Sequence, residues 1–202
     1  GVYVQNVTRL TVDVTAVGAY GASIATAAVT LNGKPYSGGT ITEAGDLSLV
    51  VSATDSRGRI GNTTYPVSIA PYTGPSFTLS ASRYDENGNP DDTGEYAKIT
   101  VSGYVTQVND RNSAVLDLNW GAGSERVEFA AGNIFYQKTV EANIDATMPI
   151  SAVLYDRLAQ TSRAMVLSTG YATLDLLAGG NGISTALCML SPAEYTASAA
   201  LF

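Results

Sequence analysis

The stretch VVSATDSRGRIGNTTYPVSI, residues 50–69, has the pattern of a β-hairpin. An apolar run leads into a turn that begins at Asp55, and Thr residues then open a second run. The same order occurs in ISAVLYDRLAQTSRAMVLS, residues 150–168, where Asp156 begins the turn. The two stretches predict one structural unit that is present twice in the chain.

Short alternating segments surround both hairpins. In TRLTVDVTA, residues 8–16, apolar residues alternate with polar ones, and the same period recurs in AVTLNG, LSLVVSATD, KITVSGYV and VLDLNW. In the last of these, Leu116, Leu118 and Trp120 fall on one side. A period of two places one face of a strand on a core and the other in water, so each segment is predicted to be a strand.

Turn-forming sequences rich in Gly, Asn, Asp and Pro separate these segments: LNGKPYSGG, DSRGR, PYTGP and ENGNP. Residues 1–72 and residues 73–160 each contain about seven strand-like runs, at intervals of about ten residues. Such spacing is typical of antiparallel β-sandwiches of the immunoglobulin-like type. We therefore predict an all-β chain with two tandem immunoglobulin-like sandwiches, residues 1–72 and 73–168. IAPYTGPSF, residues 69–77, is interpreted as the joint; the alternative is an ordinary loop inside one large sandwich.

The composition changes after residue 168. TGYATLDLLAGGNGISTALCML is nearly uncharged and predicts a Gly-rich β-hairpin, which cannot be stable alone in water. We expect it to pack against the second sandwich or against another copy of the chain. In SPAEYTASAALF, Ser191, Pro192 and Glu194 form a capping box that predicts a short C-terminal helix. Residues 169–202 are thus interpreted as a packing and assembly segment.

The composition also restricts the function. The chain has 11 basic and 18 acidic residues and no basic cluster, so nucleic acid is not an expected partner. No run of 18 apolar residues occurs, so no membrane span is expected. Without histidine, a Ser-His pair cannot form, and the only cysteine, Cys188, cannot form an intrachain disulfide. Because the chain starts at Gly1 rather than Met, we expect a segment of a longer protein.

The acidic stretch DENGNPDDTGEY, residues 85–96, was compared with a calcium loop. Asp85 suits the first ligand position. However, Pro90 stands where the sharp bend needs Gly, and Tyr96 stands where a bidentate Glu belongs. The stretch is therefore predicted to be a chain reversal between two strands.

The same stretch offers Asp91, Asp92 and Glu95 as candidate catalytic carboxylates. On a solvated turn, neither burial nor a fixed partner would shift the pKa of a carboxylate toward that of a useful acid. We predict no catalytic residue, no cofactor-binding residue, no metal ligand and no cofactor, and hence no enzyme activity.

Four segments together carry a family resemblance. ATDSRGRIG, IAPYTGPSF, SRYDENGNPDDTGEYAKITVSGYV and TGYATLDLLAGGNGIS follow one another in this order. Over residues 1–185 the chain resembles minor structural proteins of the tail tip or fibre of long-tailed bacteriophages of Gram-positive hosts. The resemblance implies tandem immunoglobulin-like modules ahead of a Gly-rich C-terminal hairpin.

The resemblance also implies a role and partners. The chain would be a virion component, extracellular when functioning, that spaces or presents a host-surface binding region. Its partners would be other copies of itself, as a homotrimer, and other phage tail proteins, with host cell-surface glycan as a further partner. No catalytic residue carries over from the family.

Three other functions stay open. A glycan-binding module would stack sugars on loop aromatic residues, with Tyr36, Tyr84, Tyr96 and Trp120 as candidates. A bacterial surface adhesin would use similar repeats. A polysaccharide-cleaving enzyme would depend on the acidic stretch. Because Trp120 is in phase with the apolar residues of its segment, we expect it to belong to the core.

Overall fold

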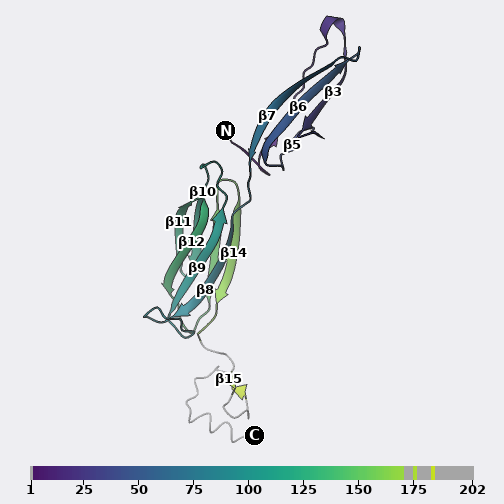
Figure 1. Ribbon diagram of the computed structural model, residues 1–202. Helices are drawn as coiled ribbons and strands as arrows, with labels where there is room; N and C mark the ends of the chain where they lie inside the picture. The colour runs from purple at the N-terminus through teal and green to yellow at the C-terminus, as the bar shows by residue number, and fades with distance from the viewer. Residues whose placement is uncertain (1, 171–174, 177–182, 185–202) are drawn as a thin grey trace, which may run out of the picture.

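The computed structural model describes residues 2–170, 175–176 and 183–184. Within them the chain forms strands and connections, with one turn of 3-10 helix at Ala19–Gly21 and no α-helix. The prediction of an all-β chain is confirmed. The strands form two units that lie end to end in an elongated molecule (Figure 1).

The first unit is built on one five-stranded sheet of order β1-β7-β6-β3-β4, beside a short β2-β5 pair. β1 is parallel to β7, and the other neighbours are antiparallel. The strands are β1 (Tyr3–Val4), β2 (Arg9–Leu10), β3 (Ile24–Leu31), β4 (Lys34–Pro35), β5 (Gly39–Thr40), β6 (Gly45–Asp55) and β7 (Ile60–Ala70).

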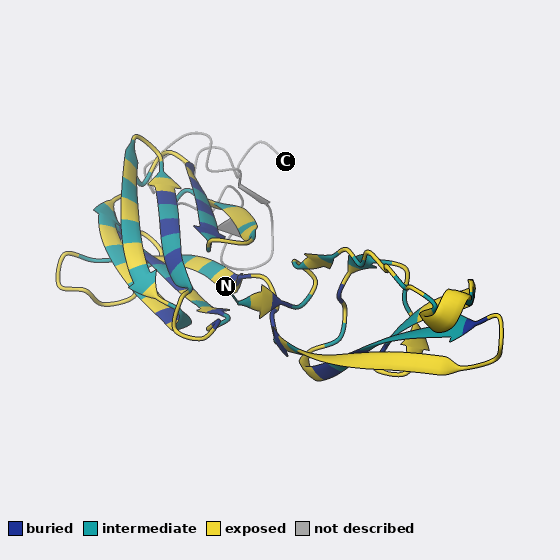
Figure 2. Cartoon of the chain, turned by 90° about the horizontal axis from the view of Figure 1, so that it is seen from above, coloured by how far each residue is buried: buried dark blue, intermediate teal, exposed yellow. Residues whose placement is uncertain are grey.

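The core of the first unit is small and lies near its base. Its buried residues are Leu31, Ile41, Leu47, Leu49 and Ile69. Beyond this core, β6 and β7 extend as a long hairpin, and β7 is exposed from residue 60 to residue 66 (Figure 2). The distal half of the unit is therefore a sheet with little covering.

The strand predicted over residues 8–16 is much shorter in the structure. Only Arg9–Leu10 is paired, with Gly39–Thr40, and residues 11–18 form no strand. Leu10 and Val12 still pack against the first core, as their period suggests. The prediction failed beyond residue 10 because alternation specifies which face is apolar but supplies no neighbouring strand to pair with.

The second unit has two sheets, of order β12-β9-β8 and β11-β10-β13-β14, and all neighbouring strands are antiparallel. The strands are β8 (Ser76–Tyr84), β9 (Tyr96–Val105), β10 (Ser113–Trp120), β11 (Gly123–Ala130), β12 (Gly132–Glu141), β13 (Met148–Tyr155) and β14 (Gln160–Leu167).

The two sheets of this unit share one core, so they form a two-layer β-sandwich. Ile99 and Val101 from one sheet and Leu116, Leu118 and Leu154 from the other are fully buried in it. Trp120 packs against the same core, as its phase predicted. The alternation of buried and exposed residues along these strands is visible as stripes in Figure 2.

Beyond β14, only two short strands are described. β15 (Asp175–Leu176) pairs antiparallel with β16 (Ile183–Ser184), within the region where the sequence predicts a hairpin. The rest of that hairpin, Cys188 and the predicted helix at residues 191–202 lie outside the described residues.

The two hairpins singled out from the sequence correspond to β6-β7 and β13-β14. Asp55 ends β6 and Asp156 directly follows β13. The Oδ1 atom of each accepts two backbone N–H groups of its own turn, at 2.9 and 3.0 Å for Asp55 and at 2.7 and 2.8 Å for Asp156. The turns thus share one construction, in agreement with the internal repeat.

Candidate functional site: the joint between the two units

The connection between β7 and β8, residues 71–75, contains a buried tyrosine. Tyr72 is only 6% exposed and forms a small core with Val4 and Val108. Val4 belongs to β1 of the first unit, whereas Val108 lies between β9 and β10 of the second. Because this core draws apolar surface from both units, its burial favours one arrangement of the units over all others.

The hydroxyl of Tyr72 binds a carboxylate of the second unit. It lies 3.1 Å from both Oδ1 and Oδ2 of Asp156. Oδ2 of Asp156 also accepts a hydrogen bond from Nδ2 of Asn112 at 2.9 Å. The β13-β14 turn, which repeats the construction of the turn at Asp55, therefore provides the binding site for the linker.

Further hydrogen bonds hold the linker on both sides. The backbone N–H of Tyr72 donates to Oε1 of Gln5 at 3.2 Å, on the first unit. On the second unit, the Thr106 hydroxyl donates to the carbonyl oxygen of Thr73 at 2.7 Å, and the Thr161 hydroxyl donates to that of Pro75 at 2.6 Å. The linker is docked along its length, so it does not act as a flexible tether.

Electrostatics keep the Tyr72 hydroxyl in its donor form. Burial, followed by the negative charge of Asp156 and the hydrogen bond to it, raises the pKa of Tyr72 above its ordinary value of 10.0. An ionised phenolate would face a carboxylate at 3.1 Å, which both repulsion and desolvation oppose. The phenol therefore stays protonated and remains a hydrogen-bond donor throughout the neutral range.

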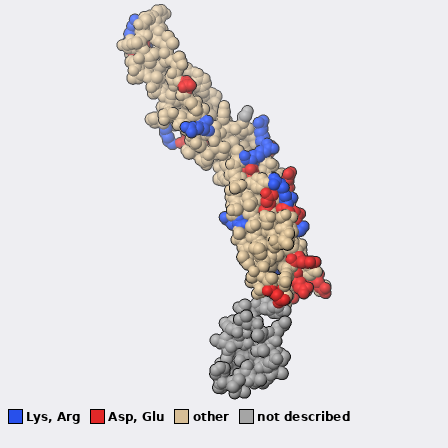
Figure 3. Space-filling view, turned by 180° about the vertical axis from the view of Figure 1, so that it is seen from behind, with Lys and Arg blue, Asp and Glu red and all other residues tan. Residues whose placement is uncertain are grey.

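The acidic stretch lies at the opposite end of the second unit. Residues 85–95 connect β8 to β9, whose residues Tyr84 and Tyr96 are paired, so the predicted chain reversal is confirmed. Oδ1 of Asp85 accepts the backbone N–H groups of Asn87 and Asn89 at 2.9 and 2.7 Å. Its Oδ2 accepts Nδ2 of Asn89 at 3.0 Å. Acidic side chains gather at this end of the unit (Figure 3).

Hydrogen bonds explain the electrostatics of this loop. Those from Asn89, first from its side chain and then from its backbone, lower the pKa of Asp85 below its ordinary value. Further along the loop, Oδ1 of Asp91 accepts the backbone N–H of Thr93 at 2.9 Å and its hydroxyl at 2.8 Å. Among the residues that the structure describes, no group of three or more His, Cys, Asp or Glu side chains is arranged to hold a metal ion.

The four aromatic candidates for sugar stacking do not form an exposed platform. The Tyr36 hydroxyl donates to carbonyl oxygens at 2.8 and 3.1 Å, and its ring packs against the first core. Tyr84, Tyr96 and Trp120 are half-buried in the second unit. The Tyr84 ring lies 3.9 Å from Nζ of Lys98, and the Trp120 ring lies 5.7 Å from Nζ of Lys138.

The sequence pointed to residues 69–77 as the joint and to Asp156 as the start of a turn, but not to the contact between Tyr72 and Asp156. The signal for Tyr72 is its position between Pro71 and Pro75. The two prolines restrict the backbone of the linker and therefore the positions that the ring can take. The signal for Asp156 is its equivalence to Asp55. Asn112 has no comparable signal, because its role depends on where the β9–β10 loop lies in space.

Comparisons with known proteins add no identification: no family model matches the sequence, and no curated protein matches it. Within the described ranges, no helix is both long enough and apolar enough to cross a membrane.

Proposed function

We propose that this chain is a non-enzymatic structural segment of a phage tail tip or fibre, which spaces or presents a host-surface binding region. The motifs that resemble tail proteins support the assignment to a virion. The docked joint supports the mechanical part of the proposal, because a spacer must transmit position from one end to the other.

Each unit is proposed to be an immunoglobulin-like module. In the constant-type immunoglobulin fold, the first, second and fifth strands share one sheet, and the third, sixth and seventh share the other. β8, β9 and β12 share one sheet in the second unit, and β10, β13 and β14 share the other. The fourth strand, β11, pairs with β10 and so extends the opposite sheet from the one expected in the constant type.

The single observation that carries the spacer role is the contact between Tyr72 and Asp156. Residues 84 positions apart in the sequence meet here and dock the linker on the second unit, while the Tyr72 ring also packs with Val4 of the first unit. Two sandwiches on a free tether would sample many angles, whereas a buried joint favours one. Small-angle scattering of the full chain tests this point. We expect the wild type to fit one elongated shape.

Two variants make that measurement decisive. Tyr72→Ser removes the ring from the small core and is expected to broaden the distribution of interdomain distances. Tyr3→Ser is the matched control, because Tyr3 is 51% exposed and lies beside the joint on β1. A wild type as broadly distributed as Tyr72→Ser would contradict the spacer role.

The virion assignment and the assembly state have separate tests. An antibody against this chain should label the tail end of purified phage particles, and particles without the epitope would contradict a virion role. Light scattering should give three times the 21.0 kDa of one chain if the proposed homotrimer forms. A well-folded monomer at all concentrations would contradict the homotrimer.

A glycan-binding role is the second candidate. The observation that favours it is Tyr20, an aromatic residue that is 87% exposed at the tip of the first unit.

A further inference from the structure

The distal tip of the first unit carries no continuation of the chain. Val2 and Ala70 pack against the small core at the joint, so this unit begins and ends at its base. Its opposite end is formed by the 3-10 helix, residues 19–21, and by the turn between β6 and β7 (Figure 1). The tip is thus reached only through loops and faces away from the second unit.

Two arginines fix the shape of this tip. Nη2 of Arg57 donates to the carbonyl oxygen of Tyr20, and Nη2 of Arg59 donates to that of Ala19, both at 3.0 Å. Nε of Arg59 also donates to Oδ2 of Asp55 at 2.7 Å. The turn and the 3-10 helix are therefore held together as one preorganised surface.

Tyr20 has an unusual backbone and an unusual exposure. Its φ of 54° and ψ of 41° are left-handed, a conformation that costs free energy for any residue with a Cβ atom. Its ring is nevertheless 87% exposed, and Cζ of Arg59 lies 5.9 Å from the ring centroid. Because the side chain is exposed, packing in the core does not offset the free-energy cost of this backbone conformation. Such strain points to a binding role.

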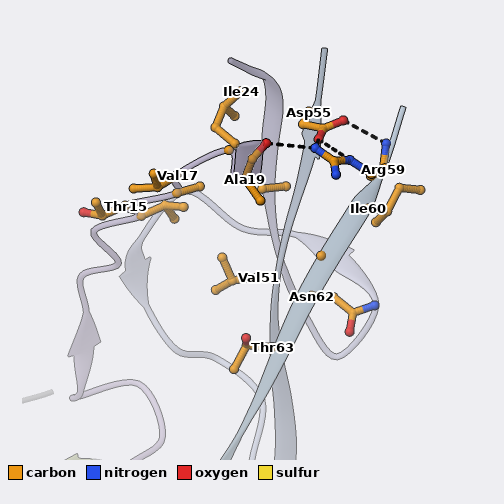
Figure 4. A pocket seen from close by; sticks show the side chains of 15 residues that line it. Thr15, Val17, Ala19, Ile24, Val51, Asp55, Arg59, Ile60, Asn62 and Thr63 are labelled. Atoms are coloured by element: carbon orange, nitrogen blue, oxygen red, sulfur yellow. Dashed lines mark hydrogen bonds and ion pairs between the residues drawn. The ribbon is translucent and has the colours of Figure 1, made fainter. Parts of the chain in front are cut away.

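A hollow of about 470 Å³ lies between residues 14–19 and the β6-β7 hairpin, and it reaches the 3-10 helix that carries this tyrosine at Ala19. Val51 forms part of its floor, and Val17 stands exposed at its edge (Figure 4). Thr63, the cross-strand partner of Val51, projects from the same face of the sheet and its hydroxyl makes no hydrogen bond within the described residues, whereas Asn62 projects from the opposite face. The hollow thus offers both apolar surface and an unused hydroxyl group.

We propose that this tip, with Tyr20 and the hollow beside it, binds a neutral saccharide. A sugar ring has an apolar C–H face, which suits an aromatic ring or valine side chains, and a rim of hydroxyl groups, which suits a hydroxyl side chain. The negative charge of Asp55 is compensated by Arg59 at 2.7 Å, and the arginines already donate to carbonyl oxygens. The hollow therefore selects by hydroxyl hydrogen bonds rather than by ligand charge.

This inference builds on the proposed presentation role, and its test is separate from the scattering test of the spacer. The full chain is applied to an array of neutral hexose and N-acetylhexosamine oligosaccharides, and any hit is quantified by titration calorimetry. We expect Tyr20→Ala and Thr63→Val each to weaken binding at least tenfold, and Tyr20→Phe to retain it. Tyr65→Ala is the matched control, because Tyr65 is 53% exposed on β7 outside the hollow.

Two results would overturn the saccharide site. One is an array on which the folded wild type binds no oligosaccharide. The other is binding that Tyr20→Ala leaves unchanged, which would move the site away from the tip. Amide spectra of each variant verify that the fold is intact. Because the spacer role depends on the joint, it would survive either result.

Discussion

Arg83 illustrates how a single buried charge can hold one end of a sandwich. It lies on β8 and is only 6% exposed. Its guanidinium donates hydrogen bonds to backbone carbonyl oxygens from three separate loops, those of Gly94, Ala142, Asn143, Ala146 and Ser168. The planar fork of an arginine suits this task because it offers five N–H donors in fixed directions.

We expect Arg83→Met to destabilise the second unit by about 3 kcal/mol or more, because several buried carbonyl oxygens lose their donor. The measurement is urea unfolding of the full chain, followed by Trp120 fluorescence. Arg163→Met on β14 is the control, since the Arg163 side chain bonds only an exposed neighbouring carbonyl oxygen. A change below about 1 kcal/mol for Arg83→Met would show that water replaces the guanidinium at little cost.

Tyr20 is the opposite case, a residue that weakens the fold where it stands. Relief of its left-handed backbone in Tyr20→Gly offsets the greater chain entropy of glycine, so we expect stability to stay level or rise by up to about 1 kcal/mol. Saccharide binding at the tip should be lost in the same variant. Thermal unfolding and calorimetry measure the two effects on one sample. A clear loss of stability would mean that the ring contributes to packing.

At the level of elements, one type of turn serves two purposes. The β13-β14 turn presents Asp156 to the Tyr72 hydroxyl, whereas the β6-β7 turn presents Asp55 to Arg59. Backbone N–H groups of the turn bond Oδ1 in both cases, whereas Oδ2 accepts from Arg59 at Asp55 and from Asn112 and Tyr72 at Asp156. The partner differs because each turn faces a different segment.

The Asp55 turn should be sensitive to acid. The backbone hydrogen bond from Arg59 contributes most to lowering the pKa of Asp55 below 3.8, and the Arg59 side chain adds to it. A lowered pKa in the folded state stabilises the turn above pH 3.8, and this contribution is lost as the pH falls through the lower folded value. Amide shifts of Arg57 and Arg59 should follow this titration. Amide chemical shifts of Arg57 and Arg59 that titrate above pH 3.8 would contradict the lowered pKa of Asp55.

The predicted strand at residues 8–16 shows the limit of sequence patterns for elements. Its period correctly identified Leu10 and Val12 as core-facing residues. Pairing, however, needs a second backbone at the right distance, and only Gly39–Thr40 supplies one. By contrast, β10 was correctly recognised from VLDLNW, because strands on both sides complete its hydrogen bonds.

At the level of the whole molecule, the joint determines how one unit is placed on the other. It combines a small apolar core with a buried phenol-carboxylate contact. Interfaces between domains of one chain are usually polar enough to allow relative motion. Here the linker itself is part of the interface, so motion requires Tyr72 to leave its site.

The joint should be sensitive to alkali. The pKa of Tyr72 is raised above 10.0 in the folded chain, so its contribution is complete below pH 10.0 and is lost as the pH rises through the folded value. Small-angle scattering should detect a broader shape only above pH 10.0. Tyr72→Phe removes this dependence. Tyr136, whose pKa burial raises to about 12, titrates in the same direction within the second unit, and Tyr136→Phe separates the two effects.

The amino-acid sequence alone determined the class of fold, the places where the chain reverses and the inward residues of the second sandwich. These features depend on local stereochemistry: alternation fixes the faces of a strand, and Asp, Asn, Gly and Pro allow the turns. Leu116 and Leu118 could be assigned to the core in this way, and the acidic stretch to a turn.

Only the tertiary structure decided which distant groups meet. Tyr72 reaches Asp156, Arg83 reaches carbonyl oxygens of three loops, and Tyr20 stands exposed over Arg59 at the tip. Each contact depends on how loops from separate strands converge at one end of a unit. No local pattern encodes that convergence, because it results from the packing of all the strands together.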